Sequence, residues 1–144
     1  LEKGLYHVTS ESAADKIIES GFLKASGHVS SYGSKKCFFF AGEPDFDGVS
    51  RNLNGFKTKL TAVKFDVDEE LASSLKHREF SDLAVTYGGN YVFKDGTATK
   101  VYLGLVEENG KLFYKEMNFD EWSNYTPKIN TGLIADSIIS FNTN

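Results

Sequence analysis

The chain has 144 residues, of which 40% are hydrophobic and 25% are charged, so it can build one domain with a real core but hardly two. Its formal net charge of −4 argues against broad, non-specific binding of nucleic acids, which requires a basic surface. The lone cysteine, Cys37, cannot form an internal disulfide, and no apolar run approaches the length of about 20 residues that spans a membrane.

The first expected element is a strand that leads directly into a helix. Residues 5–9 form a short apolar run with β-branched residues, which is typical of a strand. Ser10 or Ser12 can cap a helix over about 11–20, and Gly21 suits the left-handed position that ends one. Three apolar residues share the helical face that should pack against the sheet: Ala14, Ile17 and Ile18.

The middle of the chain should alternate between loops and strands. The polar residues 24–36 indicate a loop, and residues 37–41 (CFFFA) indicate a buried strand. We expect residues 42–59 to be a loop with at most one irregular helical turn. Residues 60–67 alternate as a half-buried strand does, and Asp68 can then begin a short helix.

The second half should consist mostly of strands and turns. The strand candidates are residues 82–87, 90–93, 101–106, 111–117 and 136–141, and Asn109-Gly110 indicates a hairpin turn before the fourth of them. No internal repeat or linker divides the chain. The expected fold is therefore a single α+β domain with two packed, largely antiparallel sheets and an early helix.

Three histidines are the candidate acid–base groups, and none belongs to a metal motif. His7 lies on the first strand, His28 in a loop and His77 after the short helix. No two have the close spacing of metal ligands, so we expect no metal centre. Cys37 enters an apolar strand, where a thiol is usually inert, so we do not favour it as a nucleophile.

His7 and Thr9 form a pair because side chains alternate along a strand. Residues two apart point to the same face, so an imidazole and a hydroxyl lie about 7 Å apart there. Such a pair can hold one small polar ligand. This is the first residue-level indication of a binding site.

Two segments carry a resemblance to a known family. Residues 5–26 (LYHVTSESAADKIIESGFLKAS) and 32–44 (YGSKKCFFFAGEP) resemble the opening of ADP-ribosyltransferases of the diphtheria-toxin and poly-ADP-ribose-polymerase type. They look closer still to the small bacterial polymorphic-toxin domains related to those enzymes. In that family a first strand carries aromatic-His-x-Thr/Ser, a helix ends in Gly-hydrophobic-Leu, and an aromatic strand ends in Phe-Ala. The resemblance covers about residues 4–44.

The resemblance implies an NAD site. In it, His7 would hydrogen-bond a ribose of NAD, a neighbouring hydroxyl would help to hold the cofactor, and nicotinamide would stack on a phenylalanine of the aromatic strand. A phenylalanine here replaces the tyrosine often found in that second motif. A dianionic cofactor also needs a cation, for which we consider an arginine on the following loop. The resulting cofactor-binding candidates are His7, Thr9, Ser10, Phe39, Phe40, Ala41 and Arg51.

The resemblance also implies a carboxylate on a late strand, which would polarise a ribose hydroxyl and stabilise an oxocarbenium-like transition state. No motif of this sequence fixes that residue. Glu116 is the first choice, because strand alternation puts it on one face with Leu112 and Tyr114. Glu121 is the second choice, and Glu107 follows.

Further expectations follow from the likeness to toxin domains. The chain would be the C-terminal catalytic domain of a larger protein and would act in the cytoplasm of a target cell after delivery. Its partners would be an ADP-ribose acceptor, either protein or nucleic acid, and a cognate immunity protein. The sequence does not identify the acceptor of ADP-ribose, because the loops that bind the acceptor vary on a fixed scaffold.

Two other functions remain open at the level of sequence. The first is a metal-free RNase that uses His7, His28 or His77 as acid and base, with Lys76 or Arg78 on the phosphate. The second is an acidic binding or immunity-type module whose aromatic residues are only core. The NAD-dependent ADP-ribosyltransferase or NAD glycohydrolase is the favoured hypothesis.

Overall fold

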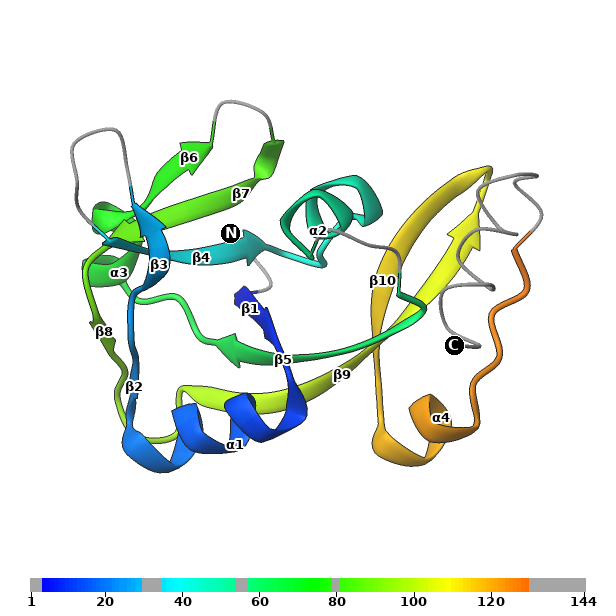
Figure 1. Cartoon of the computed structure of the whole chain (residues 1–144), viewed down its shortest axis with the longest axis horizontal. Helices are drawn as coiled ribbons and strands as arrows, with labels where there is room; N and C mark the ends of the chain where they lie inside the picture. Colours follow the sequence, from blue (N-terminus) through cyan, green and yellow to red (C-terminus); the bar gives the residue numbers. More distant parts are fainter. Residues whose placement is uncertain (1–3, 30–34, 54–56, 79–80, 130–144) are drawn as a thin grey trace.

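The computed structural model describes residues 4–29, 35–53, 57–78 and 81–129, and within them one large antiparallel sheet forms the frame (Figure 1). Its eight strands include β3 (Ser26–Val29), which pairs with β4. The other seven follow the order β10 (Lys111–Met117), β9 (Ala98–Glu108), β5 (Lys59–Phe65), β1 (Leu5–Thr9), β4 (Lys35–Ala41), β7 (Ser81–Gly88) and β6 (Lys76–Arg78).

The smaller elements flank this sheet. A separate two-stranded antiparallel sheet joins β2 (Phe22–Leu23) to β8 (Tyr91–Val92). The described helices are α1 (Glu11–Ser20), α2 (Phe46–Leu53), α3 (Glu69–Ser74) and α4 (Phe119–Asn124). The expected α+β class, with antiparallel sheets and an early helix, is confirmed. No helix among the described residues is long and apolar enough to cross a membrane.

The large sheet buries both of its faces, because side chains alternate along each strand. We call the two sides the α1 face and the α2 face after the helices that cover them. The α1-face cluster contains Leu5, Ala14, Leu23, Cys37, Phe39, Val63, Phe65, Leu71, Val85 and Tyr91. The α2-face cluster contains Tyr6, Phe40, Phe46, Val49, Leu60, Ala62, Val101, Leu103, Leu105 and Tyr114.

The large sheet curls around its α2 face, so that the segment after β4 contacts β10. An isolated bridge pairs Asp45, just after β4, with Phe113 of β10. The N–H of Tyr114 also donates to the carbonyl of Pro44 at 3.1 Å. The continuation of β4 therefore lies against the opposite edge of the sheet, and the α2-face cluster is enclosed between them.

The opening of the chain folds as its sequence predicts. Ser10 caps α1 by accepting the N–H of Ala13 at 3.2 Å, and Gly21 ends the helix with a φ of 82°. Asn109 and Gly110 form the hairpin turn, with φ values of 53° and 78°. The expected apolar face of α1 packs on the sheet. The strands expected at 37–41, 82–87, 90–93, 101–106 and 111–117 are present as β4, β7, β8, β9 and β10, and the helix expected after Asp68 is α3.

Three expectations about the fold are wrong. The loop expected at 24–36 contains β3, an edge strand held by backbone pairing rather than by an apolar pattern. The loop expected at 42–59 contains the two-turn helix α2, which an Asp45 side chain begins by accepting the N–H of Gly48 at 2.7 Å. The strand expected to be half-buried, β5, is buried on both faces, because its side chains enter the α1-face cluster on one side and the α2-face cluster on the other. The strand expected at 136–141 lies outside the described residues.

Candidate functional site

The central feature of the candidate site is a gap in strand pairing beside β1. Pairing of β1 with β5 runs along all of Leu5–Thr9. Pairing of β1 with β4 ends at Tyr6, opposite Phe40. Figure 1 shows β1 running away from β4 towards α1. We call the unpaired stretch the seam, and it lies between Val8–Thr9 of β1 and Cys37–Phe39 of β4.

His7 stands where the seam opens. Its Nδ1 lies 2.8 Å from the carbonyl oxygen of Phe38 on β4. A carbonyl only accepts, so Nδ1 carries the proton and donates. Burial lowers the pKa of His7 below its usual 6.5, although the Phe38 contact acts in the opposite direction. The imidazole is therefore neutral at pH 7, and its Nε2 is a hydrogen-bond acceptor with no partner among the described residues.

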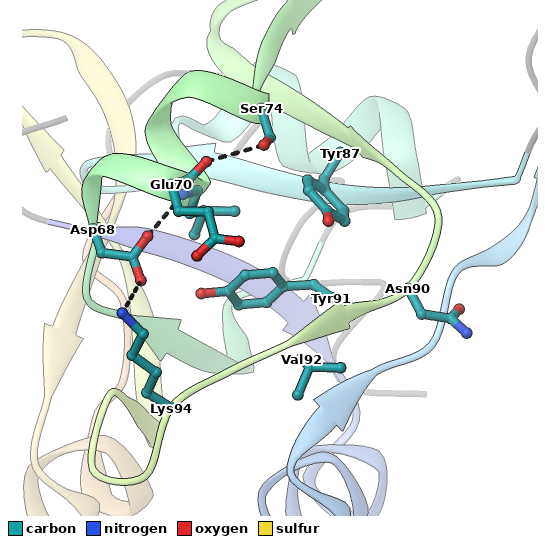
Figure 2. Close-up of a pocket in the computed structure, with 9 residues that line it drawn as sticks. Asp68, Glu70, Ser74, Tyr87, Asn90, Tyr91, Val92 and Lys94 are labelled. Atoms are coloured by element: carbon teal, nitrogen blue, oxygen red, sulfur yellow. Dashed lines mark hydrogen bonds and ion pairs between the residues drawn. The ribbon is translucent and has the colours of Figure 1, made fainter.

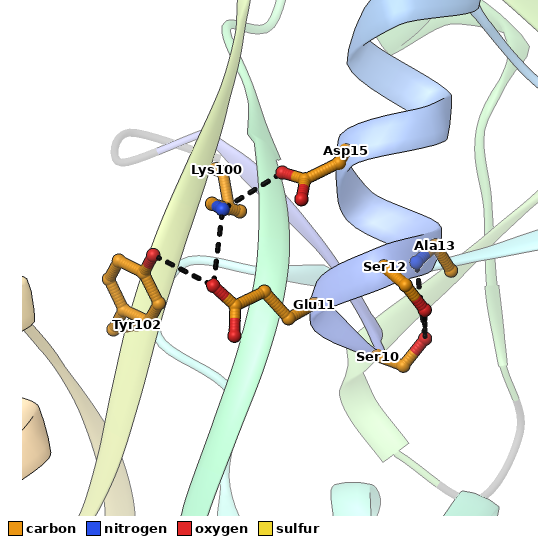
Figure 3. Close-up of polar contacts among 7 residues, drawn as sticks. All are labelled: Ser10, Glu11, Ser12, Ala13, Asp15, Lys100 and Tyr102. Carbon is orange, nitrogen blue, oxygen red and sulfur yellow. Dashed lines mark hydrogen bonds and ion pairs between the residues drawn. The ribbon is translucent and has the colours of Figure 1, made fainter.

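Thr9 shares the α1 face with His7, whereas Ser10 serves the helix. Thr9 is half-buried, lies opposite the buried Thr61, and its hydroxyl has no hydrogen-bond partner in the described part of the chain. The Ser10 hydroxyl accepts from Ala13 and lies 3.4 Å from the hydroxyl of Ser12 (Figure 3). Of the two candidate hydroxyls, Thr9 is the one left available to a ligand.

The aromatic strand does not present an open ring. Phe39 is fully buried on the α1 face, with its ring centroid 6.3 Å from that of His7. Phe40 is 3% exposed and lies on the α2 face. Ala41 is also buried, where it pairs with Leu5. In this conformation neither the ring of Phe39 nor that of Phe40 is exposed to a planar ligand, and the stacking of nicotinamide on this strand stays a prediction.

Cys37 is an inert side chain of the core. The residue is 1% exposed, and its thiol donates to the carbonyl oxygen of Gly89 at 3.0 Å. Burial raises the pKa of this thiol to about 11. A thiol that stays protonated and enclosed is not a nucleophile.

Glu116 lies on the opposite face of the sheet from His7. Its carboxylate accepts the hydroxyl of Tyr6 at 3.0 Å and the ammonium of Lys64 at 3.3 Å. Glu116 also pairs with Leu103, whose side chain belongs to the α2-face cluster. Burial, followed by the contact with Glu116, raises the pKa of Tyr6. The structure therefore does not bring the first-choice carboxylate together with His7.

The other two glutamates are placed differently. Glu107 alternates with Leu105 along β9 and so lies on the α2 face. Glu121 is exposed in the first turn of α4. That helix stacks Trp122 on Tyr102, with centroids 4.9 Å apart, and Tyr102 lies opposite Thr61 on the α1 face. Glu121 alone of the three shares the side of the sheet that carries His7.

The sequence did not single out a polar cluster that borders Thr9 on the α1 face. Lys100 donates to Asp15 at 2.8 Å and to Glu11 at 3.4 Å, and the Tyr102 hydroxyl donates to Glu11 at 3.4 Å (Figure 3). Hydrogen bonding to Asp15 chiefly raises the pKa of Lys100. The cluster ties the first turn of α1 to β9 and so fixes where β1 ends. In the sequence, this cluster is indicated by two acidic residues one helical turn apart, Glu11 and Asp15.

Two of the three remaining candidates lie away from His7. Arg51 belongs to α2, which packs on the opposite face. His77 lies on β6, with β4 and β7 between it and β1. His28 lies on β3. The side chains of these three residues are outside the described part of the structure.

Comparisons with known proteins add no identity to this site. No family model matches the sequence, no curated protein matches it, and no solved structure matches the fold. Within the described residues no three histidine, cysteine, aspartate or glutamate side chains gather as metal ligands. The resemblance to ADP-ribosyltransferases therefore rests on the motifs quoted above.

Proposed function

We propose that the chain is an NAD-dependent ADP-ribosyltransferase, or an NAD glycohydrolase that uses the same site. The observation that carries this proposal is His7 at the opening of the seam. It is fixed through Nδ1, it is neutral, and its Nε2 is an acceptor without a hydrogen-bond partner among the described residues. An acceptor of that kind suits the hydroxyl of a ribose. The motifs around His7 and β4 support the same assignment.

The backbone of the seam offers a second contact. The carbonyl of Phe38 faces β1, so by alternation Tyr6 and Val8 direct their N–H and C=O groups towards β4. Pairing with β4 stops at Tyr6, which leaves the groups of Val8 at the open part of the seam. A carboxamide such as that of nicotinamide carries one acceptor and a donor, and it complements one N–H and one C=O.

The reaction requires little from the protein. The bond between ribose C1′ and the pyridinium nitrogen breaks, and nicotinamide leaves as a neutral base with the electron pair. Water or an acceptor group then bonds to C1′ and loses its proton. Because the pyridinium already activates the bond, orientation and charge stabilisation are sufficient. His7 and Thr9 would orient the ribose from one face of β1.

We assign the stabilising carboxylate to Glu121 rather than to Glu116. Glu121 lies on the α1-face side and is exposed, whereas Glu116 is engaged by Tyr6 and Lys64 on the far side of the sheet. Glu11 is also on the α1 face, but Lys100 and Tyr102 already bind its carboxylate. A macromolecular acceptor of ADP-ribose and a cognate immunity protein belong to the same proposal.

Nicotinamide release from NAD tests the proposal. The purified chain is incubated with NAD and, separately, with total tRNA, as wild type and as the variants His7→Asn and His77→Asn. Asparagine can still donate to the carbonyl of Phe38 but lacks the Nε2 acceptor. We expect release by wild type and by His77→Asn, and none by His7→Asn.

Two results would contradict this assignment. Cleavage of tRNA without consumption of NAD, lost in both histidine variants, would establish the RNase. Consumption of neither substrate would contradict the proposal and favour a binding module. Melting curves of the three proteins confirm that any loss of activity is not a loss of fold.

A further inference from the structure

A concave site lies on the α1 face, apart from the seam. It is a hollow of about 180 Å³ between α3 and the β7–β8 connection (Figure 2). We call it the α3 hollow, and it is lined by Asp68, Glu70, Leu71, Ser74, Tyr87, Asn90, Tyr91, Val92 and Lys94. The buried ring of Phe39 separates it from His7, because Phe39 contacts both Tyr91 and His7.

We propose that the α3 hollow binds an organic cation, namely a primary ammonium or guanidinium group at the end of a short alkyl chain. Its volume is well below the range of about 300–1,000 Å³ typical of pockets for drug-sized ligands. A dinucleotide such as NAD does not fit such a space. The end of a lysine or arginine side chain, or a free amine of that size, does.

The charges of the α3 hollow favour a cation. Asp68 caps α3 by accepting the N–H of Leu71 at 2.7 Å and pairs with Lys94 at 3.5 Å. Glu70 projects towards the ring of Tyr91 (Figure 2), and its carboxylate has no partner among the described residues. Two carboxylates against one ammonium leave one negative charge unbalanced, and it resides on Glu70.

The aromatic wall adds a second attraction for a cation. Tyr87 and Tyr91 meet edge to face, with ring centroids 5.6 Å apart at 74°. Tyr91 is only 8% exposed and is held from behind by Phe39 and Phe65, so its ring is rigid. A cation beside a carboxylate and over such a ring gains both ion-pair and cation–π energy. Burial raises the pKa of the Tyr91 hydroxyl, so the phenol stays neutral.

Lys94 would compete with an incoming cation for the carboxylate of Asp68. Its side chain is 69% exposed at the rim and reaches Asp68. An incoming cation would share or displace this contact. Removal of the Lys94 charge should therefore strengthen binding, and removal of the Glu70 charge should weaken it. These opposite changes in affinity distinguish a cation-binding site from an apolar hollow.

The test is an NMR titration that follows the ring protons of Tyr87 and Tyr91. The probes are n-butylammonium and n-propylguanidinium, with n-butanol as the uncharged control. The variants are Glu70→Gln and Lys94→Gln. The matched control is Glu69→Gln, which removes an exposed charge from the same turn of α3 without lining the hollow.

We expect saturable shifts with both cations and none with butanol. Glu70→Gln should weaken the affinity by about tenfold, Glu69→Gln should leave it within about twofold, and Lys94→Gln should tighten it. Shifts of equal size with butanol, or equal losses in Glu69→Gln and Glu70→Gln, would overturn the assignment.

A further titration with a short peptide distinguishes a cation carried by a protein from a free amine. Val92 is 74% exposed at the rim, and its strand partner Phe22 is 37% exposed. If the cation belongs to a protein, acetyl-Leu-Lys-Leu-amide should bind at least about tenfold more tightly than n-butylammonium, and Val92→Ser should remove that difference. Equal affinities for the two probes assign the site to a free amine.

Discussion

Two neighbouring residues of β1, Tyr6 and His7, lie on opposite faces of the large sheet and differ in how their polar groups are hydrogen-bonded. Tyr6 points to the α2 face, where it is 2% exposed and its hydroxyl is bound to Glu116. His7 points to the α1 face, where one ring nitrogen is fixed by Phe38 and the other has no described partner. Along β1, the polar group on the α2 face is therefore paired, whereas the α1 face carries one ring nitrogen of His7 and the hydroxyl of Thr9 without a hydrogen-bond partner among the described residues.

The difference follows from how each face is closed. The α2 face is covered by α2 and shut by the contact between Asp45 and Phe113, so polar groups at its margin must pair among themselves. The α1 face is covered by α1, and β1 leaves β4 on the way to that helix, so strand pairing ends at Tyr6. A ligand site is therefore expected on the α1 face, and the predictions below probe that distinction.

The largest effect is expected from Phe39→Ala. This ring lies at the centre of the α1 face, in edge contact with His7, Phe65 and Tyr91. Truncation should cost about 3–5 kcal/mol of unfolding free energy, measured by urea denaturation. A loss below about 1 kcal/mol would mean that the α1 face is not packed as described.

A pair of neighbouring hydroxyls separates stability from binding. Ser10→Ala removes the cap of α1 and should cost about 1 kcal/mol without affecting NAD. Thr9→Val keeps the shape of the strand residue and should weaken NAD binding with little change in melting temperature. If the two variants exchange these effects, Ser10 rather than Thr9 contacts the ligand.

The pH dependence should report the buried imidazole. The folded-state pKa of His7 is lowered below the 6.5 of the unfolded chain. The unfolded chain therefore takes up a proton first, and stability that is present above pH 6.5 is lost as the pH falls through the lower folded-state pKa. Urea denaturation at a series of pH values should show this slope, and His7→Asn should lack it. An unchanged slope in the variant would mean that another group titrates.

The smallest effect is expected from Glu116→Gln. Lys64 and Glu116 are 28% and 39% exposed, and partly exposed ion pairs contribute less than about 1 kcal/mol. The variant should fold normally and release nicotinamide at the rate of wild type. Loss of release in a folded Glu116→Gln protein would return the catalytic role to this residue and contradict the assignment to the α1 face.

Local chemistry made the start of the fold and part of the site predictable. The cap at Ser10, the stop at Gly21 and the hairpin at Asn109-Gly110 depend on residues close in sequence. Alternation also placed Tyr114 and Glu116 on one face of β10, as the structure has them. The pairing of His7 with Thr9 on one face follows from the same rule.

Long-range registers were beyond the reach of the sequence. Whether the Glu116 side of β10 is also the His7 side of β1 depends on the registers across β9 and β5, which no local pattern encodes. The α3 hollow likewise needs α3 and β8 to meet. The sequence predicted a loop where α2 lies, because a glycine, Gly48, stands in the first turns of that helix. The apolar residues Phe46, Val49 and Leu53 nevertheless have helical spacing.

The most direct test of the central claim compares NAD affinity between the two faces. Calorimetry would use an NAD analogue in which a methylene group replaces the oxygen of the nicotinamide ribose ring, so that no turnover occurs. We predict that His7→Asn binds at least about tenfold more weakly than wild type, while Glu116→Gln binds equally well. Unchanged affinity in His7→Asn together with loss of binding in Glu116→Gln would contradict a site on the α1 face.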